Sequence, residues 1–356
     1  MEKAKTICSN FIINEEVRKI TVLTSGHIND TYLIETDGQM QYVLQRINDF
    51  VFNDPKTLVR NKVHVSQHLN EIPSAYKALQ FVKTKTGEYF HEDDSRLFWN
   101  MMVYLKDSKT YIIPSSSALV YEAGKLYGDF IQRMDSFPVN KIAETISMFH
   151  SVPHRNSQFE DSLINTSEEL LAKAHDEIYY ARSVKEEMFE LEQAREQGKY
   201  PIRVLHNDTK ISNVLFDEND LGLAVIDFDT VMPGIVHYDF GDAVRSMCSN
   251  RREDDPDVEG LSFRLDYFEA FCKGYGELTT NILTSAEKGD FTLGVKVMIY
   301  IMGIRFLTDY LNKNIYYKVD YETHNLIRAK NQFRLLKSVY SKEKEIVSII
   351  ESYFLK

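Results

Sequence analysis

The sequence contains few of the residues that build disulfide-rich or zinc-stabilised proteins. Among its 356 residues there are only three cysteines. Cys8, Cys248 and Cys272 are odd in number, and no two of them have the Cys-x-x-Cys spacing. This pattern excludes a disulfide framework and a cysteine zinc site, so we expect three free, buried thiols.

The sequence also shows no excess of basic residues and no pattern typical of a secretion signal. The formal net charge is −11, from 53 acidic and 42 basic residues, whereas a nucleic-acid surface would need a basic patch. The first residues lack the apolar core of a secretion signal, and the longest late apolar stretch is interrupted by Lys296 and Arg305. We therefore expect a cytoplasmic, monomeric protein that binds a small molecule and neither nucleic acid nor a membrane.

The most informative segment of the chain is residues 205–229, which read LHNDTKISNVLFDENDLGLAVIDFD. His206-x-Asp208, then Asn213, then an Asp-Phe-Asp triplet follow one another in the order of a kinase catalytic loop and its metal-binding strand. Phosphoryl transfer needs a carboxylate that accepts or orients the acceptor proton, and oxygen ligands that hold magnesium against the nucleotide phosphates. The spacing therefore predicts a phosphotransferase.

Each residue type in this segment predicts a role. Asp208 is the candidate base. Asn213 and Asp227 are the candidate Mg²⁺ ligands, since hard cations prefer oxygen. Lys210 lies where it can steady the transferred phosphoryl group as charge develops.

A strand over residues 221–229 would place Asp227 and Asp229 on the same side, about 6 to 7 Å apart at a rise of roughly 3.3 Å per residue. Asp227 would then bind the metal, while Asp229 accepts hydrogen bonds from a polyhydroxy substrate. The alternative interpretation is an Asp-rich turn between strands, which residues 217–220 just upstream are expected to form.

Hydrophobic periodicity and turn residues predict an α+β fold with two lobes, similar to a protein kinase. Residues 1–105 form the expected nucleotide-binding lobe, a small antiparallel sheet with one helix, and residues 106–356 form a larger, mainly helical catalytic and substrate-binding lobe. Strands are predicted over residues 17–24, 31–36, 41–47, 79–85 and 97–105, with a helix from Asp54-Pro55 to about Leu69. Helices are predicted over residues 122–134, 139–149, 167–197, 294–311 and 321–340, after a polar hinge at residues 106–110.

The third predicted strand differs from that of protein kinases. It offers Gln45 or Arg46 to the nucleotide phosphates in place of the usual lysine: alternation with Val43 favours Gln45, and charge favours Arg46. Residues 55–70 contain no acidic residue, so the usual ion pair between a strand lysine and a helix glutamate cannot form there. Asn61 is the candidate to hydrogen-bond Gln45 instead.

The nucleotide base is expected between the lobes. Adenine would lie against the strand at residues 101–105, centred on Val103, and exchange hydrogen bonds with its backbone. The first hairpin contains only Gly26 and is not a Gly-x-Gly-x-x-Gly loop, so it makes fewer phosphate contacts.

The segments LHNDTKISNVLF and VIDFDTVMPGIVHYDFGDAVR resemble the aminoglycoside phosphotransferase and choline kinase superfamily. In this comparison Asp239 is the downstream acidic residue that holds the catalytic loop. Four further segments resemble the N-acetylhexosamine 1-kinases within that superfamily; they are residues 26–32, 42–48, 305–311 and 325–329.

The resemblance implies a kinase that uses ATP and Mg²⁺ to phosphorylate the anomeric hydroxyl of N-acetylglucosamine or N-acetylgalactosamine. It also implies that His27, Asp229 and Arg305 contact the sugar, with Tyr316 as a weaker contact. An anomeric hydroxyl is more acidic than an ordinary sugar alcohol, so a positioned Asp208 suffices as proton acceptor.

Several alternatives stay open at this point. Arg305 could pair with Asp309 one helical turn away, and Tyr310 or Tyr317 could replace Tyr316 as its neighbour. The acceptor could be choline, homoserine, methylthioribose or an aminoglycoside. A nucleotide-binding module without turnover is the remaining alternative.

Overall fold

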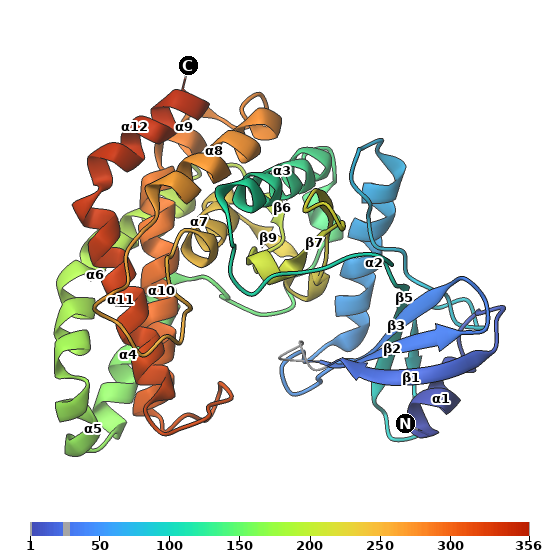
Figure 1. Ribbon diagram of the computed structural model, residues 1–356. Coiled ribbons are helices and arrows are strands. Elements are labelled where there is room, and N and C mark those ends of the chain that lie inside the picture. The colour runs from blue at the N-terminus through green and yellow to red at the C-terminus, as the bar shows by residue number, and fades with distance from the viewer. Residues whose placement is uncertain (1, 24–28, 356) are drawn as a thin grey trace.

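The computed structural model describes residues 2–23 and 29–355. A five-stranded antiparallel sheet forms the amino-terminal part, in the order β1-β2-β3-β5-β4 (Figure 1). Its strands are β1 (Val17–Leu23), β2 (Asp30–Thr36), β3 (Gln41–Arg46), β4 (Phe90–Glu92) and β5 (Phe98–Val103). The first three strands and the fifth lie where the sequence predicts them.

The predicted fourth strand at residues 79–85 is wrong. Only a bridge between Phe81 and Met102 connects this segment to β5, and β4 occupies the rest of the sheet edge. The carbonyl of Leu79 instead accepts hydrogen bonds from Ser66 and Asn70 of the neighbouring helix, at 2.5 and 2.9 Å. The segment is therefore held by these helix contacts and by isolated bridges to β5 and to Phe11, and not by a continuous strand ladder.

The two faces of the sheet have different partners. One face buries Leu44, Trp99 and Met101 against helix α1 (Glu2–Cys8). The other face carries Val43 and packs toward helix α2 (Pro55–Glu71).

The start of α2 is fixed by its cap, as the sequence predicts. The carboxylate of Asp54 accepts the Thr57 N–H at 3.1 Å, and Pro55 occupies the first turn, where its missing N–H costs nothing.

The remainder of the chain is mainly helical (Figure 1). Its helices are α3 (Ser117–Met134), α4 (Val152–Asn165), α5 (Glu168–Lys173), α6 (His175–Glu196), α7 (Val236–Met247), α8 (Leu265–Thr279), α9 (Ser285–Gly289), α10 (Phe291–Leu311), α11 (His324–Ser341) and α12 (Glu343–Phe354). Two small sheets pair β6 (Arg203–Leu205) with β9 (Met232–Gly234) and β7 (Val214–Phe216) with β8 (Gly222–Val225). The structure is thus the expected α+β arrangement of a small antiparallel sheet and a larger helical part.

Two predicted helices differ from the structure. Residues 139–149 form only a 3-10 turn, η1 (Val139–Lys141), because the backbone of Ala143 bonds to the Asn61 side chain of α2. The predicted helix over 167–197 is interrupted at Ala174, where α5 ends and α6 begins.

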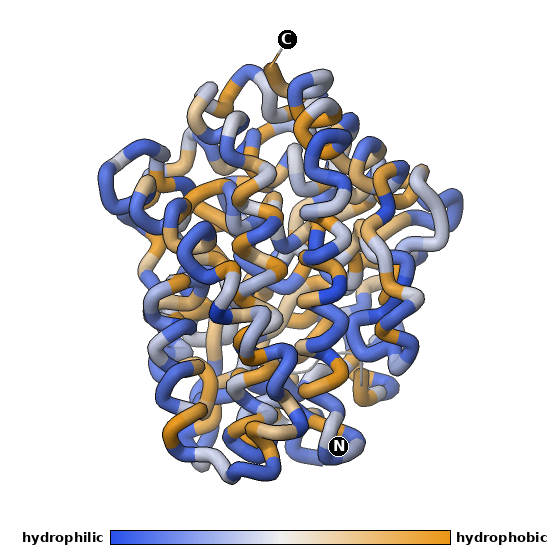
Figure 2. The backbone as a smooth tube through the Cα atoms, turned by 90° about the vertical axis from the view of Figure 1, so that its left-hand side faces the viewer, coloured by the Kyte–Doolittle hydropathy of each residue, from blue (hydrophilic) through white to orange (hydrophobic). Residues whose placement is uncertain are grey.

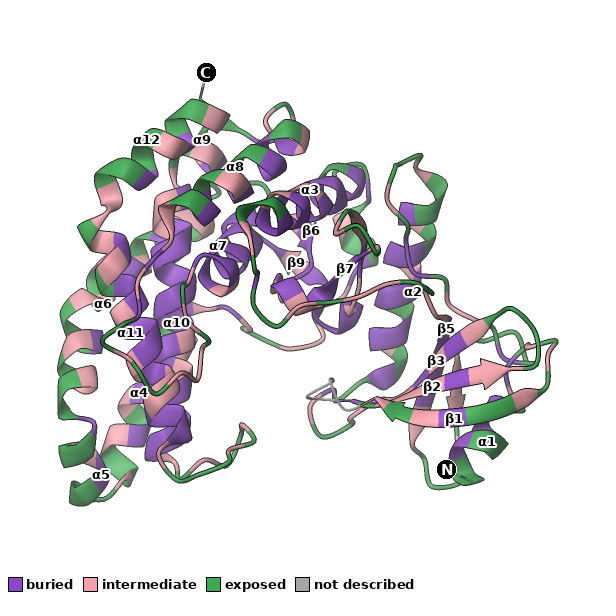
Figure 3. Cartoon of the chain, viewed as in Figure 1, coloured by how far each residue is buried: buried purple, intermediate pink, exposed green. Residues whose placement is uncertain are grey.

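Helix α10 forms the centre of the helical part. It is long and apolar enough to cross a membrane by length and composition, but 72% of its most apolar window is buried inside the protein. It contacts α4, α6, α7 and α11, and Figure 3 shows it as largely buried. Seen from the side of α6, hydrophilic and hydrophobic segments alternate along the outer helices, as expected where one face is buried (Figure 2). Helix α10 therefore has the surroundings of a core helix.

The contact of α7 with α10 depends on two glycines. A methyl group on Gly241 would lie 2.4 Å from the carbonyl oxygen of Gly294. We expect Gly241→Ala to destabilise the protein by about 1–3 kcal/mol through overpacking, measured as a lower thermal midpoint. Gly289→Ala is the matched control, since no heavy atom lies within 4 Å of its added methyl group. An unchanged midpoint for Gly241→Ala would contradict this account.

Candidate active site

Helix α7 fixes the backbone of residues 206–209. The carboxylate of Asp239 accepts the N–H groups of His206 and Asn207 at 2.8 and 2.7 Å, and Asp242 accepts that of Thr209 at 3.0 Å. Burial raises the pKa of Asp239 to about 6, although His206 and the two N–H groups act to lower this pKa. The expectation that Asp239 holds the loop is confirmed.

His206 is buried and fills a structural position. Its Nε2 bonds to the carbonyl of Ile226 at 2.8 Å, and its ring meets the rings of Tyr127, Phe130 and Phe228 at steep angles. The histidine therefore joins the loop to the segment that carries Asp227.

Asp208, Lys210 and Asn213 lie together. The Lys210 ammonium is 2.8 Å from Asp208 Oδ2, and Asn213 Nδ2 donates to the same oxygen at 2.9 Å. Burial acts to raise the pKa of Asp208, but the charge and hydrogen bond of Lys210 outweigh it, so the pKa is lowered. The carboxylate is therefore ionised at neutral pH, as a proton acceptor must be.

Asp227 does not lie on a strand, so the predicted strand over residues 221–229 is wrong. Strand β8 ends at Val225, and Asp227 adopts the left-handed conformation, with φ of 67° and ψ of 63°, before the 3-10 turn η3 (Phe228–Thr230). Because the backbone turns here, strand alternation does not relate Asp227 to Asp229. Left-handed backbone is uncommon for a non-glycine residue and is found preferentially at functional sites.

The carboxylate of Asp227 has no hydrogen bond or ion pair with any of the described residues, unlike its neighbours. Burial, followed by the charges of Asp229 and Asp208, raises the pKa of Asp227 to about 7. The charges of Lys210 and Lys62 act in the opposite direction without outweighing these effects. A carboxylate that has no direct partner and lies near two like charges is a favourable place for a metal ion.

The residues present fit Mg²⁺. The described part of the chain holds no group of three or more His, Cys, Asp or Glu that could form an all-protein metal site. Ile226 N donates to Asn213 O at 2.9 Å, which places Asp227 beside Asn213. Since Asn213 Nδ2 bonds Asp208, its Oδ1 is the atom that could face a cation. One amide oxygen and one carboxylate suit Mg²⁺, which completes its shell with water and phosphate.

Asp229 is not placed on an open face toward a substrate, which corrects the expectation from alternation. It is buried, and its two oxygens accept hydrogen bonds from Lys62 Nζ and Asn29 Nδ2. Lys62 was missed by the sequence reasoning. The available signal was its position on a helix without acidic residues before Glu71, next to Asn61, which was expected to bond Gln45 but bonds Ala143.

The structure distinguishes Gln45 from Arg46. Gln45 Oε1 faces the interior and accepts a hydrogen bond from Lys62 Nζ at 3.1 Å. Arg46 is paired with Asp30, at 2.7 Å from Nε to Oδ2, on the opposite face of the strand. Strand alternation therefore predicted correctly that the side chain of Gln45 points into the protein. The side chain of Arg46 points away from the face between the lobes.

Val103 is not free to bind adenine as expected. Its N–H donates to Gln80 O at 2.8 Å, and its side chain packs with the cluster on the α1 face of the sheet. The neighbouring Tyr104 N–H donates to Gln41 O at 2.8 Å. A purine would have to use other backbone groups of this connection.

Arg305 lies against aromatic rings and not against an acid. Its guanidinium is 5.3 Å from the centre of the Phe149 ring and 5.7 Å from that of Tyr317. Asp309 instead accepts the N–H groups of Tyr316 and Tyr317, at 2.8 and 2.9 Å. The alternative of an Arg305–Asp309 ion pair is wrong, because this carboxylate holds the loop after α10.

Arg305 lies near the catalytic loop. His150 Nε2 bonds the carbonyl of Asn207 at 3.2 Å, and burial followed by the positive charge of Arg305 lowers the pKa of His150 to about 3. The charge of Asp208 acts on the same histidine in the opposite direction. His150 thus contacts the loop that carries Asp208 and also lies near Arg305.

Tyr316, the remaining predicted sugar contact within the described residues, is not the tyrosine that lies against Arg305. Tyr316 is 58% exposed and meets the Tyr317 ring at 4.8 Å between centres, so Tyr317 is the direct neighbour of Arg305. Tyr310 is buried away from solvent. His27 lies outside the described residues.

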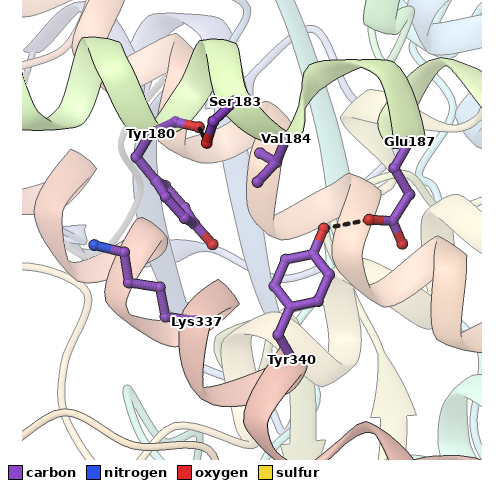
Figure 4. A pocket seen from close by; sticks show the side chains of 6 residues that line it. All are labelled: Tyr180, Ser183, Val184, Glu187, Lys337 and Tyr340. Carbon is purple, nitrogen blue, oxygen red and sulfur yellow. Dashed lines mark hydrogen bonds between the residues drawn. The ribbon is translucent and has the colours of Figure 1, made fainter.

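A surface hollow of about 480 Å³ is lined by side chains of α6 and α11 (Figure 4). These two helices lie well away from the catalytic loop (Figure 1). Among the side chains that line the hollow, Tyr340 donates to Glu187 at 2.5 Å, and the same carboxylate also pairs with Lys296 at 2.7 Å. The hollow contains none of the predicted site residues.

Comparison with known proteins agrees with this geometry. The sequence matches the phosphotransferase enzyme family over residues 19–279. The chain belongs to this family. It is therefore a small-molecule kinase, and the resemblance to the superfamily is confirmed at that level.

Solved structures share the fold of this phosphotransferase. A microcompartment-associated aminopropanol kinase is 16% identical, with a TM-score of 0.67, 98% of this chain and 99% of that chain covered. An amicoumacin kinase in complex with AMP-PNP and Ca²⁺ is 13% identical, with a TM-score of 0.62 and coverage of 94% and 92%. Choline kinase from Cryptosporidium parvum is 14% identical, with a TM-score of 0.59 and coverage of 100% and 99%. At these identities the likeness concerns the fold.

Replacing Asp208 tests its role as the base. We expect Asp208→Asn to lower turnover by at least about 100-fold while nucleotide binding stays nearly intact, because the change removes the proton acceptor but neither expected metal ligand. Initial rates and calorimetric nucleotide titration measure the two quantities, with Asp266→Asn on the outside of α8 as control. Turnover within about tenfold of the wild type would contradict the assignment.

Replacing Asp227 tests the metal site. We expect Asp227→Asn to abolish the dependence of nucleotide binding on Mg²⁺, because the unpaired carboxylate is lost while the fold around it keeps its bonds. Titration of nucleotide with and without Mg²⁺ measures this dependence. An unchanged Mg²⁺ requirement would exclude Asp227 as a ligand.

Proposed function

We propose that this phosphotransferase transfers the γ-phosphoryl group of ATP to the anomeric hydroxyl of an N-acetylhexosamine and releases the sugar 1-phosphate and ADP. Asp208 accepts the hydroxyl proton, and Lys210 steadies the transferred group. Asn213 and Asp227 hold Mg²⁺, which when bound neutralises phosphate charge. Gln45 faces the nucleotide from the sheet.

The observation that carries the choice of acceptor is the positive, aromatic surface beside the catalytic loop. In the described ranges Arg305 has no carboxylate partner and lies between the rings of Phe149 and Tyr317. Burial followed by the charge of Arg305 lowers the pKa of nearby Arg155 to about 10. A second guanidinium therefore shares this region, and Arg155 donates only to neutral oxygens of Phe149 and Gln158.

Such surroundings repel cationic acceptors such as choline and aminoglycosides, which need acids or an aromatic cage. A neutral sugar is not repelled by these guanidinium groups. Its hydroxyl and acetamido oxygens can accept hydrogen bonds from a guanidinium, and its apolar face can lie on an aromatic ring. The ionised Asp208 is sufficient for an acidic anomeric hydroxyl.

We also propose that the chain divides near residue 105 into the two expected lobes. The protein acts as a monomer in the cytoplasm, without a nucleic-acid or membrane partner. Size-exclusion chromatography with light scattering tests the monomer.

The product identifies the acceptor. The protein is incubated with ATP, Mg²⁺ and a mixture of N-acetylglucosamine, N-acetylgalactosamine, choline and homoserine, and phosphorus NMR is recorded with proton coupling. A new doublet coupled to an anomeric proton is expected. A different phosphate ester would overturn the sugar proposal and assign another acceptor to the same kinase.

Arg305 should act on the acceptor and not on the nucleotide. We expect Arg305→Met to raise the KM for the sugar by about tenfold or more, since a hydrogen bond to a charged donor contributes roughly 1.5–3 kcal/mol, while the KM for ATP is unchanged. Arg334→Met on the outer face of α11 is the control. Equal changes in both KM values would point to a structural role for Arg305.

A further inference from the structure

Lys62 occupies an unusual position for a charged side chain. It lies on α2, is 1% exposed, and its ammonium group contacts Gln45 Oε1 at 3.1 Å and Asp229 Oδ1. The ring of Phe81 covers it, with 5.8 Å from Nζ to the ring centre. A buried ammonium group is costly unless a carboxylate compensates it, and Asp229 is the carboxylate that does so.

The arrangement reverses the usual connection between sheet and helix. In protein kinases a strand lysine pairs with a helix glutamate. Here the strand supplies the neutral Gln45, the helix supplies the lysine, and α2 has no acidic residue before Glu71. The negative partner comes from the catalytic half of the protein, since Asp229 belongs to η3.

Asp229 is held from a second direction. Its Oδ2 accepts Asn29 Nδ2, and Asn29 Oδ1 accepts the Asn48 N–H at 2.9 Å. Asn29 directly precedes β2, and α2 lies between the sheet and the helical part (Figure 1). Two separate segments of the sheet side therefore fix one carboxylate of the catalytic side.

This restraint distinguishes the two neighbouring aspartates. Asp229 has both oxygens bonded, whereas Asp227, two residues earlier, has no partner among the described residues. Without the ammonium group, Asp229 would be a second uncompensated carboxylate beside Asp227. It could then turn toward a cation and change the ligand geometry.

We propose that Lys62 is a positioning residue for phosphoryl transfer, which holds Asp229 away from the nucleotide so that Asp227 receives the metal–nucleotide complex. Gln45 keeps the ammonium group in place from the sheet. The proposal rests on the metal site of the proposed function and is independent of the acceptor.

The test measures binding of ATP by calorimetry as a function of Mg²⁺ concentration, without any acceptor. We expect Lys62→Gln to raise the Mg²⁺ concentration for half-maximal binding by about 10–100-fold, the usual effect of removing a group that orients a metal ligand. In the presence of acceptor, kcat at subsaturating Mg²⁺ should fall while the acceptor KM stays constant.

A double variant separates positioning from simple packing. Gln45→Lys with Lys62→Gln moves the ammonium group to the other side of the same contact, and it should recover most of the lost Mg²⁺ affinity. Lys296→Gln is the matched control, because Lys296 is also buried and pairs with two carboxylates, Glu187 and Glu343, on the far helices. It should lower the thermal midpoint and leave the Mg²⁺ dependence unchanged.

Wild-type Mg²⁺ dependence in Lys62→Gln, or a double variant no better than the single one, would overturn the proposal. If Lys62→Gln does not fold, the double variant decides alone: near wild-type Mg²⁺ dependence supports the proposal, and a raised requirement rejects it. Since no sugar is needed, failure of the sugar assignment would leave this outcome unaffected.

Discussion

The arrangement of the site depends on how the charges of a group of buried and half-buried carboxylates are compensated. Asp208 is paired with Lys210, Asp229 with Lys62 and Asp242 with Arg245, while Asp239 accepts two backbone N–H groups. Buried charge without compensation is strongly unfavourable, so each pairing fixes a segment of chain as well as a charge. Asp227 is the member of this group without a hydrogen-bond or ion-pair partner in the described structure, so it is the candidate for binding a cation.

The charge pairing of Asp229 also connects the part of the fold around the sheet to the helical part. Lys62 reaches Asp229 from α2, and the adjacent Asn61 bonds both backbone groups of Ala143. On the other side, α7 supports the catalytic loop through Asp239 and packs closely on α10 through Gly241. The catalytic loop is therefore supported from the central helices, while the turn that carries Asp227 and Asp229 is held by Lys62 of α2 and by Asn29.

The acceptor side follows a different principle. Arg305 is surrounded by rings and by a second guanidinium, and the acid that could have neutralised it, Asp309, is used by the backbone of the following loop. The region therefore keeps a positive charge beside an ionised base. This combination is the basis for proposing a neutral, oxygen-rich acceptor in place of a cationic one.

The sequence by itself determined the catalytic loop, four of the five strands of the small sheet (β1, β2, β3 and β5) and the capped helix α2, because these follow from local spacing, turn residues and caps. It also predicted the inward direction of Gln45 from alternation, which holds as long as the strand is regular. It could not place Asp229, because the chain leaves the strand at Val225 and turns through a left-handed residue. Only the tertiary structure decided that Lys62, far away in sequence, supplies the missing charge, since a buried ion pair between distant segments leaves no periodic pattern along the chain.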